Sequence, residues 1–407
     1  MNVPKLRFKN AEGADFPLWT ISKLGNEVQF SKGGKLGKSD LQKEGSHQCL
    51  LYGELYTSYG SIASKIFSRT DTDSDTTSQK YDVVMPTSGE TAEDIATATC
   101  IPFDGILYGG DLIILRSQTL YGPFLSYQIN SSLKRKISRV AQGKSVVHIG
   151  AEKIKPISFS FPCLEEQQKI ASFFSTLDQK IEINERKLEA LEKLKKGLMQ
   201  KVFSQEIRFR TNEGCYFPEW ETKHLSEIVE SISYGLNAAA VKFDGKNRYL
   251  RITDINERTN KYNSINPVSP SCTADKKYLL KEGDIVFART GNSVGKTYIY
   301  EKSDGDLYYA GFLIRARVNN NICPYFIFIQ TLTNKYKKWV DIMSKRSGQP
   351  GINSEEYGNL EVVLPCREEQ ELIASLFTKF DSKIDKVITK INHLKKLKQG
   401  FMQQMFV

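Results

Sequence analysis

Apolar residues recur every seven positions in two long segments of the chain, each following a Pro-Cys pair. The first segment repeats along positions 170–198 and 174–202, and the second along positions 373–401 and 377–405. A heptad pattern held for about five heptads without an internal proline predicts a long helix with one apolar stripe. At 1.5 Å per residue, each helix should be on the order of 55 Å long.

Such a stripe must be buried, and the nearest partner with the same period is the other helix. The residues expected to pair the helices are Ile170, Phe174, Leu177, Ile181, Leu188, Leu191, Ile373, Phe377, Phe380, Ile384, Ile391 and Leu394. Polar residues interrupt the stripe at Asn184, Lys195 and Lys398, where they would fix the register at some cost in stability. The alternative is that each helix packs on its own globular domain.

These helical segments are two copies of one sequence unit. Pro365 follows Pro162 by 203 residues, and Gly400 follows Gly197 by the same interval. A second pair of matching segments, 7–19 and 208–220, recurs at an interval of 201 residues and shares the Arg-Phe, Phe-Pro and Trp positions. Repeats of this length are not solenoid units. They predict two half-molecules in one polypeptide, and hence a target with two halves.

Between the repeats lie two blocks, residues 21–160 and 222–362, that resemble each other much less. Both mix short strand-like runs, such as Asp111–Leu115 and Asp284–Ala288, with Gly, Asn and Asp turns. This pattern predicts two α+β domains with different loops on similar frames. Because loops carry specificity, the two blocks should recognise two different targets.

Composition and charge narrow the class of partner. The 407 residues exceed what one core usually supports. The net charge of +10 favours a polyanionic partner, with nucleic acid as the main candidate. Because residues 165–201 carry eight basic and seven acidic residues, most of the surplus lies outside the helices.

Neither a membrane nor a disulfide framework is expected. The first residues lack the apolar core of a signal peptide, and no run approaches the roughly 20 apolar residues of a membrane span, so a cytoplasmic protein is predicted. The seven cysteines never form a Cys-x-x-Cys pair, which argues against a disulfide framework or a zinc site.

Two basic clusters occupy matched positions in the blocks. The first comprises Lys134, Arg135, Lys136, Arg139 and Lys144, and the second comprises Lys337, Lys338, Lys345 and Arg346. A single basic run is usually a solvated helix face. Two runs at equivalent points are what phosphate contacts on two half-sites would require.

The segment Gly291–Thr297 resembles a phosphate-binding loop but has three residues between its glycines where that loop needs four. The following Tyr-Ile-Tyr continues as a strand and not as the helix that would hold phosphate. We predict a hairpin tip carrying Arg289, Asn292 and Lys296. Because Asn and Arg side chains can make bidentate contacts to adenine and guanine, the tip is a candidate for base reading. A solvent-exposed turn is the alternative.

Catalytic signatures are missing or misplaced. The four histidines have no carboxylate or cysteine at metal-ligand spacing. Glu185-Arg186-Lys187 has a nuclease-like form but lies on a charged helix, and no Asn-Pro-Pro-aromatic segment is present to hold a flipped adenine. We therefore predict that the chain is not an enzyme and binds no metal.

Together these features resemble the specificity subunit of type I restriction–modification systems over essentially the whole chain. The doubled Phe/Leu-Pro-x-x-Glu-Glu-Gln start of a long helix, at 161–167 and 364–370, is the most specific element. The Phe-Pro-x-Trp start of each block and the stretch Gly283–Gly291 support it.

The resemblance implies an α+β protein with two target-recognition domains separated by two long helices that form an antiparallel coiled coil, in a pseudo-twofold internal repeat. The expected segments are a first domain at 1–160, a central helix at 161–205, a second domain at 206–362 and a C-terminal helix at 363–407.

The partners implied are double-stranded DNA with a bipartite site, two modification subunits that methylate adenine, and restriction (motor) subunits. S-adenosylmethionine is expected on the modification subunits, with no cofactor on this chain. A coiled-coil scaffold without a DNA role would explain the heptads but not the matched basic clusters, and an autonomous NTPase would rest on the imperfect phosphate loop.

Overall fold

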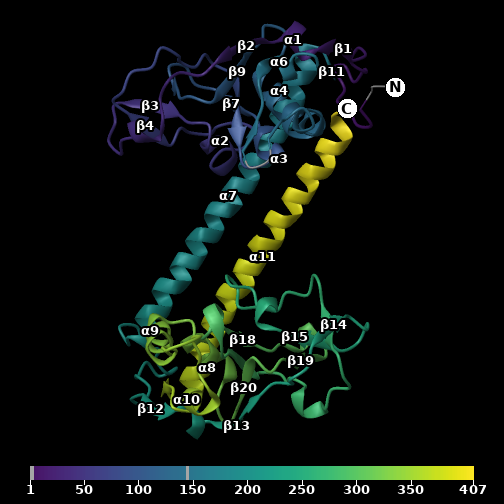
Figure 1. Cartoon of the computed structure of the whole chain (residues 1–407). Coiled ribbons are helices and arrows are strands. Elements are labelled where there is room, and N and C mark those ends of the chain that lie inside the picture. The colour runs from purple at the N-terminus through teal and green to yellow at the C-terminus, as the bar shows by residue number, and fades with distance from the viewer. Residues whose placement is uncertain (1–3, 144–145) are drawn as a thin grey trace. The chain divides into compact units, whose positions relative to one another are not determined.

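The computed structural model describes residues 4–143 and 146–407, and the chain divides into two compact units. Unit 1 comprises Met1–Arg186 together with Val387–Val407, and unit 2 comprises Lys187–Lys386. Each unit therefore contains one globular block and a part of both long helices (Figure 1).

The two heptad segments form the long helices α7 (Leu164–Phe203) and α11 (Arg367–Met405). Each begins shortly after its Pro-Cys pair, and two glutamates in each first turn complement the positive end of the helix dipole. The 40 residues of α7 correspond to a length of about 60 Å. The predicted long helices are confirmed.

Ion pairs show that the two helices run antiparallel. In unit 1, Asp178 of α7 pairs with Lys398 of α11 and Glu185 pairs with Lys395, both at 2.6 Å. In unit 2, Lys195 of α7 pairs with Asp381 of α11. Residue numbers rise along one helix as they fall along the other, so the predicted antiparallel coiled coil of an α+β protein is confirmed.

Each of the two lysines that interrupt the apolar stripe pairs with an aspartate that also accepts a hydrogen bond from a tyrosine. In unit 1 the Asp178 carboxylate accepts a hydrogen bond from the Tyr127 hydroxyl at 2.8 Å in addition to its ion pair with Lys398. In unit 2 the Asp381 carboxylate accepts from Tyr325 and pairs with Lys195. We call these groups the Tyr–Asp–Lys triads.

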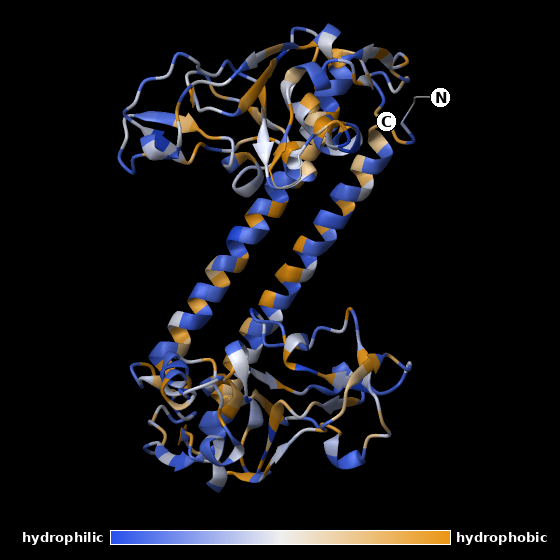
Figure 2. Ribbon diagram, viewed as in Figure 1, coloured by the Kyte–Doolittle hydropathy of each residue, from blue (hydrophilic) through white to orange (hydrophobic). Residues whose placement is uncertain are grey.

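The stripe residues are buried in two settings. At the start of each helix they belong to a globular core, with Ile170, Phe174 and Leu177 in the unit 1 core and Ile373 and Phe377 in the unit 2 core. Farther along the helices, Ile181, Leu188, Ile384 and Ile391 are buried, whereas Leu191, Phe380 and Leu394 are half-buried. Figure 2 shows hydrophobic and hydrophilic residues alternating along both long helices. The first part of each stripe therefore packs on a globular core, and pairing of the helices through the residues farther along stays a prediction.

The block of unit 1 is built on a four-stranded antiparallel sheet of order β2-β9-β5-β7. A three-stranded sheet β4-β3-β8 and the ribbons β1-β11 and β6-β10 complete it. Its strands are β1 (Thr20–Lys23), β2 (Gln29–Lys32), β3 (His47–Leu50), β4 (Ser68–Thr70), β5 (Asp82–Pro86), β6 (Ser88–Gly89), β7 (Thr99–Ile101), β8 (Leu107–Tyr108), β9 (Leu112–Arg116), β10 (Val147–His148) and β11 (Ser158–Phe161). Its helices are α1 (Leu24–Glu27), α2 (Glu54–Thr57), α3 (Ala92–Ile95), α4 (Gly122–Gln128), α5 (Lys134–Ser138) and α6 (Ala151–Ile154), and a π-helical turn, Ile129–Leu133, joins α4 to α5.

The block of unit 2 has a four-stranded antiparallel sheet of order β13-β20-β17-β18 and the ribbons β12-β21, β14-β16 and β15-β19. Its strands are β12 (Glu221–His224), β13 (Val229–Tyr234), β14 (Ala240–Lys242), β15 (Arg248–Leu250), β16 (Val268–Pro270), β17 (Ile285–Ala288), β18 (Thr297–Ile299), β19 (Leu307–Tyr309), β20 (Leu313–Val318) and β21 (Glu361–Leu364). Its helices are α8 (Pro324–Gln330), α9 (Asn334–Met343) and α10 (Ser354–Gly358).

The two sheets repeat one frame. In each, an arginine of the second strand in the sheet order pairs with an aspartate at the beginning of the third, Arg116 with Asp82 at 2.8 Å and Arg317 with Asp284 at 2.7 Å. Because the two ion pairs occupy the same place in their sheets, β9 of unit 1 corresponds to β20 of unit 2, and β5 corresponds to β17.

The predicted strand-like runs Asp111–Leu115 and Asp284–Ala288 do contain strands. They are not equivalent, because the first lies in β9 and the second in β17.

The repeated Glu-Gln pair at each helix start fastens the block to the helix. The Gln167 amide oxygen accepts from the Tyr121 N–H at 2.8 Å, and its amide nitrogen donates to the Pro162 carbonyl at 2.9 Å. Gln370 makes the same two bonds, to Cys323 at 2.9 Å and to Pro365 at 2.8 Å. The motif that carries the sequence resemblance is therefore a structural clamp.

The preceding glutamates bind the segment that leads into each block. Glu166 is fully buried and accepts from Arg7 Nε at 3.0 Å and Nη2 at 2.6 Å. Glu369, also fully buried, accepts from Trp220 Nε1 at 2.9 Å and lies 3.5 Å from Arg208. This explains why the segments 7–19 and 208–220 repeat together with the helices.

Candidate nucleic-acid interface

The basic cluster of unit 1 begins on α5, directly after the π-helical turn. Arg135, Lys136 and Arg139 are exposed and Lys134 is half-buried. Lys136 Nζ donates to the Ser158 carbonyl at 3.0 Å, which ties this lysine to β11. The fifth predicted residue, Lys144, lies outside the described residues. The cluster is thus a short, largely solvent-facing cationic helix end.

The basic cluster of unit 2 lies on α9 and in the loop that follows it. Tyr336 and Val340 bury one face of α9, so Lys337 and Lys338 face solvent. Lys345 and Arg346 are also exposed, and Arg346 pairs with Glu356 at 2.5 Å. Among the described residues, no carboxylate lies within ion-pair distance of the three lysines Lys337, Lys338 and Lys345, so these are the cations that remain available for phosphate.

The predicted hairpin tip is present between β17 and β18, which pair antiparallel. Gly291 and Gly295 have φ of +74° and +81°, a conformation that favours glycine. The chain continues into β18 and not into a helix, as expected, so the tip does not form the phosphate-binding loop it resembles in sequence.

The structure separates the three residues of the tip. Asn292 and Lys296, together with Lys337, line one groove of about 760 Å³ within unit 2. Arg289 is not among the residues that line the groove. Lys296 is mostly buried and lies 3.7 Å from Glu257, so Asn292 and Lys337 are the freer polar groups there.

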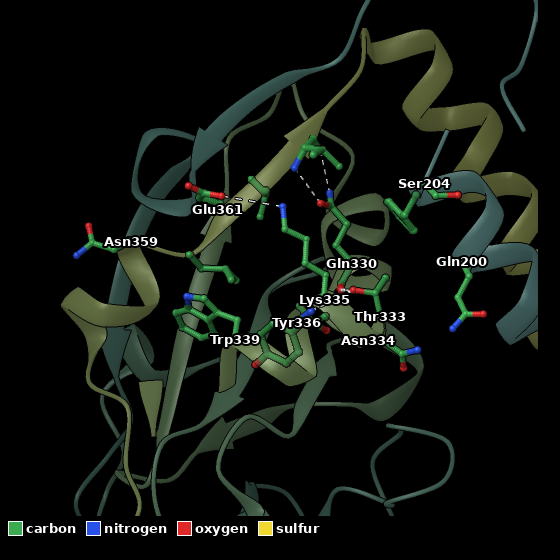
Figure 3. Close-up of a pocket in the computed structure, with 15 residues that line it drawn as sticks. Gln200, Ser204, Gln330, Thr333, Asn334, Lys335, Tyr336, Trp339, Asn359 and Glu361 are labelled. Atoms are coloured by element: carbon green, nitrogen blue, oxygen red, sulfur yellow. Dashed lines mark hydrogen bonds and ion pairs between the residues drawn. The ribbon is translucent and has the colours of Figure 1, made fainter. Parts of the chain in front are cut away.

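A second pocket, of about 550 Å³, lies between the end of α7, α9 and β21 (Figure 3). Phe203, Tyr336 and Trp339 contribute its aromatic surface, and Lys335 lies on it, 4.0 Å from Glu361. Glu361 is the one carboxylate among the described residues that line it. The lining offers no acid–base pair or nucleophile–base pair, so the pocket is a surface feature without catalytic groups.

Within residues 4–143 and 146–407, no three or more His, Cys, Asp or Glu side chains gather in a cluster that could hold a metal ion. In the same part of the chain, no helix is long and apolar enough to cross a membrane.

If the clusters bind phosphate, neutralising Lys337 and Lys338 should weaken binding to specific and random duplexes about equally. The log–log salt slope should become shallower by roughly 0.9 for each lost contact, and base preference should not change. Titration at several salt concentrations measures this, with assembly state checked by sedimentation. An unchanged slope with intact assembly would make the cluster a solvated helix face. The Lys134, Arg135 and Lys136 cluster should give an effect of similar size.

Comparison with known proteins identifies the family. The type I restriction modification DNA specificity domain matches residues 18–193 and again residues 218–396. The chain therefore belongs to this family, with two copies of the domain. It is a DNA-recognition subunit that assembles with other restriction–modification subunits, and it is not itself a catalytic subunit.

Individual relatives agree with this assignment. The type I restriction enzyme MjaVIII specificity subunit of Methanocaldococcus jannaschii is 26% identical over 97% of this chain and 94% of its own length. The MjaX specificity subunit of the same organism is 31% identical over 50% of this chain, and the match spans about half of that protein, 49%. The S subunit of a type I restriction–modification system from M. genitalium shares the fold, with a TM-score of 0.68 at 17% identity, covering 100% of this chain and 99% of that one.

Proposed function

We propose that the chain reads a bipartite DNA site, with the block of each unit recognising one half and the paired helices setting the spacing between them. The observation that carries the proposal is one repeated sheet frame bearing different side chains in its loops. A frame that stays constant while its loops differ suits two targets held at a fixed separation.

We further propose that two modification subunits, which carry S-adenosylmethionine and methylate adenine, dock on the internal repeat, and that restriction (motor) subunits join for cleavage. A pseudo-twofold repeat offers two equivalent docking surfaces, which supports two copies of one partner. This chain would hold no cofactor itself. DNA recognition in this role would take place in the cytoplasm.

Exchanging residues 21–160 for the corresponding block of a relative should change one half of the recognised sequence. The other half and the spacing should stay the same, because the frame and the helices are retained. Sequencing methylated adenines in cells that carry the exchanged chain with its modification subunits measures both halves at once. A simultaneous change in both halves, or a target without an unspecified spacer, would contradict the proposal.

A further inference from the structure

The four-stranded sheets of the two units end in the same backbone arrangement, which we call the junction. In unit 1 it forms where the chain leaves β5. The Thr87 N–H donates to the Asp111 carbonyl at 2.8 Å, and the Thr87 carbonyl accepts from the Ile149 N–H at 2.9 Å. Three stretches of chain, 87, 111 and 149, are thus joined around one residue.

The junction of unit 2 forms where the chain leaves β17. The Arg289 N–H donates to the Phe312 carbonyl at 3.1 Å, and the Arg289 carbonyl accepts from the Ile352 N–H at 2.9 Å. These bonds match those of unit 1 one for one, so Arg289 occupies the position of Thr87, and Phe312 that of Asp111. Tyr234 ends β13 as Lys32 ends β2.

The side chains at these matched positions differ completely in chemistry. In unit 1 the Thr87 hydroxyl donates to the Asp111 carboxylate at 3.3 Å, beside the exposed Lys32. In unit 2 the Arg289 guanidinium stacks on the Tyr234 ring at 4.8 Å, and the neighbouring Phe312 is 61% exposed. Two domains that recognise different base sequences require this combination, in which the same backbone arrangement carries different polar side chains.

Arg289 is held in place by the Tyr234 side chain. Stacking on Tyr234 orients the guanidinium, and the Ser354 N–H and hydroxyl each donate to the Tyr234 hydroxyl at 3.1 Å. Burial opposes ionisation of Tyr234, but these bonds and the Arg289 charge lower its pKa below the usual value. The Arg289 Nε is buried without a partner among the described residues, and the polar side chain that the guanidinium contacts is that of Tyr234.

The junction of unit 2 also adjoins the basic cluster. The Gly291 N–H donates to the Pro350 carbonyl at 3.0 Å, and the Gly351 N–H donates to the Ser344 carbonyl at 3.1 Å, which brings the loop with Lys345 against the hairpin tip. Lys345, which is free to contact phosphate, thus lies in the loop that packs against the hairpin tip. The same tip carries Arg289, a planar hydrogen-bond donor that Tyr234 orients. Phosphate contacts position a protein on the duplex, and base contacts specify the sequence.

We propose that Arg289, oriented by Tyr234, reads the major-groove edge of a guanine in the half-site of unit 2. The proposal rests on the bipartite reading described above. A guanidinium donates to guanine O6 and N7 together, whereas a glutamine side chain makes the corresponding bidentate contact to adenine. In unit 1 the Thr87–Asp111 pair occupies the same place with different hydrogen-bonding groups, so the same base contact is not available there.

The test uses the chain assembled with its modification subunits. R289Q should lose roughly 5- to 150-fold of the preference for guanine at one base pair and shift that position toward adenine. The other half-site should be unchanged. R289K should lose the preference without the shift. Y234A should weaken the same single position, and Y234F should restore most of it because the ring remains.

The matched control is R210Q, which removes an arginine stacked on Tyr216 at 4.3 Å in the same unit but outside the junction. It should leave base preference unchanged. Binding to a panel of duplexes substituted one base pair at a time gives the readout, with thermal unfolding to check that each variant folds. Loss of affinity for all duplexes alike, or no change at any position, would overturn the role of Arg289. If exchanging residues 222–362 left the site unaltered, the bipartite reading itself would fail instead.

Discussion

Replacing Glu166 by alanine should destabilise unit 1 by about 3–5 kcal/mol. The glutamate is fully buried, and its two oxygens accept from Arg7 Nε and Nη2 at 3.0 and 2.6 Å. The Arg7 side chain is itself only 15% exposed. The hydrogen bond that Arg7 donates to Glu166 raises the pKa of Arg7 against the opposing effect of burial. Because a guanidinium is not deprotonated in proteins, Arg7 remains a cation when Glu166 is removed.

The cost arises from the arginine left behind. A buried cation without a counterion loses its hydration and gains nothing in return, which is why breaking one partner of a buried pair costs more than the pair contributes. Urea unfolding of the E166A chain, with its modification subunits present in both samples, measures the loss. R7M/E166M, which removes both charges, should recover a large part of it.

The neighbouring glutamate supplies the control. Glu165 lies 3.3 Å from Lys169 on the helix surface and is 57% exposed, so E165A should cost less than about 1 kcal/mol. Glu369 offers a graded comparison, because one of its oxygens has no hydrogen-bond partner among the described residues and Arg208 is 3.5 Å from the other. E369A should therefore cost less than E166A. Equal losses from E165A and E166A would contradict the argument.

The long helices, the doubled frame and the basic clusters could be predicted because each leaves a local signal: a heptad period, a matched interval or a run of charge. What Glu166 and Gln167 do could not be predicted in the same way. Their partners, Arg7 and Tyr121, come from distant parts of the chain, and no period links a buried side chain to a backbone N–H in another element.

The hairpin tip shows a second limit. The sequence places Arg289, Asn292 and Lys296 within eight residues, but the tip turns between them, so Asn292 and Lys296 line the groove and Arg289 stacks on Tyr234. Proximity in sequence predicted the hairpin but not which of its side chains line the same groove. The Arg289 N–H donates to the Phe312 carbonyl, a contact that spacing along the sequence does not predict.

The polar interruptions of the apolar stripe were expected to fix the helix register, but the sequence could not supply their partners. Asn184 donates to the Lys180 carbonyl at 2.6 Å in its own helix. Lys195 and Lys398 instead cross to the other helix, and the tyrosines that complete their triads come from the helices α4 and α8 of the globular blocks.

We expect Asp381→Leu to destabilise unit 2 by about 2–3 kcal/mol. Lys195 is 14% exposed and would lose its counterion, and the Tyr325 hydroxyl would lose its acceptor. Burial and the neighbouring Asp381 charge raise the pKa of Tyr325, so this side chain is a neutral donor and cannot replace the lost anion. Urea unfolding measures the loss, and the equivalent Asp178→Leu should act on unit 1 through Tyr127 and Lys398.

Removing the whole triad should have a different effect from breaking it. In the triple variant Y325F/K195M/D381L, no buried charge or hydroxyl is left without a partner, and well-packed apolar replacements of buried ion pairs are often neutral or stabilising. The triple variant should therefore recover most of the stability that D381L loses. The triple variant would also have fewer polar residues in its apolar stripe. Because a polar residue in a heptad stripe fixes the alignment of the two helices at a cost in stability, the variant should specify one register less strongly.

Comparing D381L with the triple variant separates the effect of the triad on protein stability from its effect on the spacing between the two half-sites. If the triads align the helices, the triple variant should methylate sites whose spacer differs from the native length, while both half-sites keep their sequences, because neither block is altered. Sequencing methylated adenines detects a broadened spacer, and E165A serves as the control that should retain the native one. A triple variant that is stable and keeps a single spacer length would show that the triads contribute stability alone. A broadened spacer in a fully stable protein would show that the Tyr–Asp–Lys triad of unit 2 helps to hold the two half-sites at one separation.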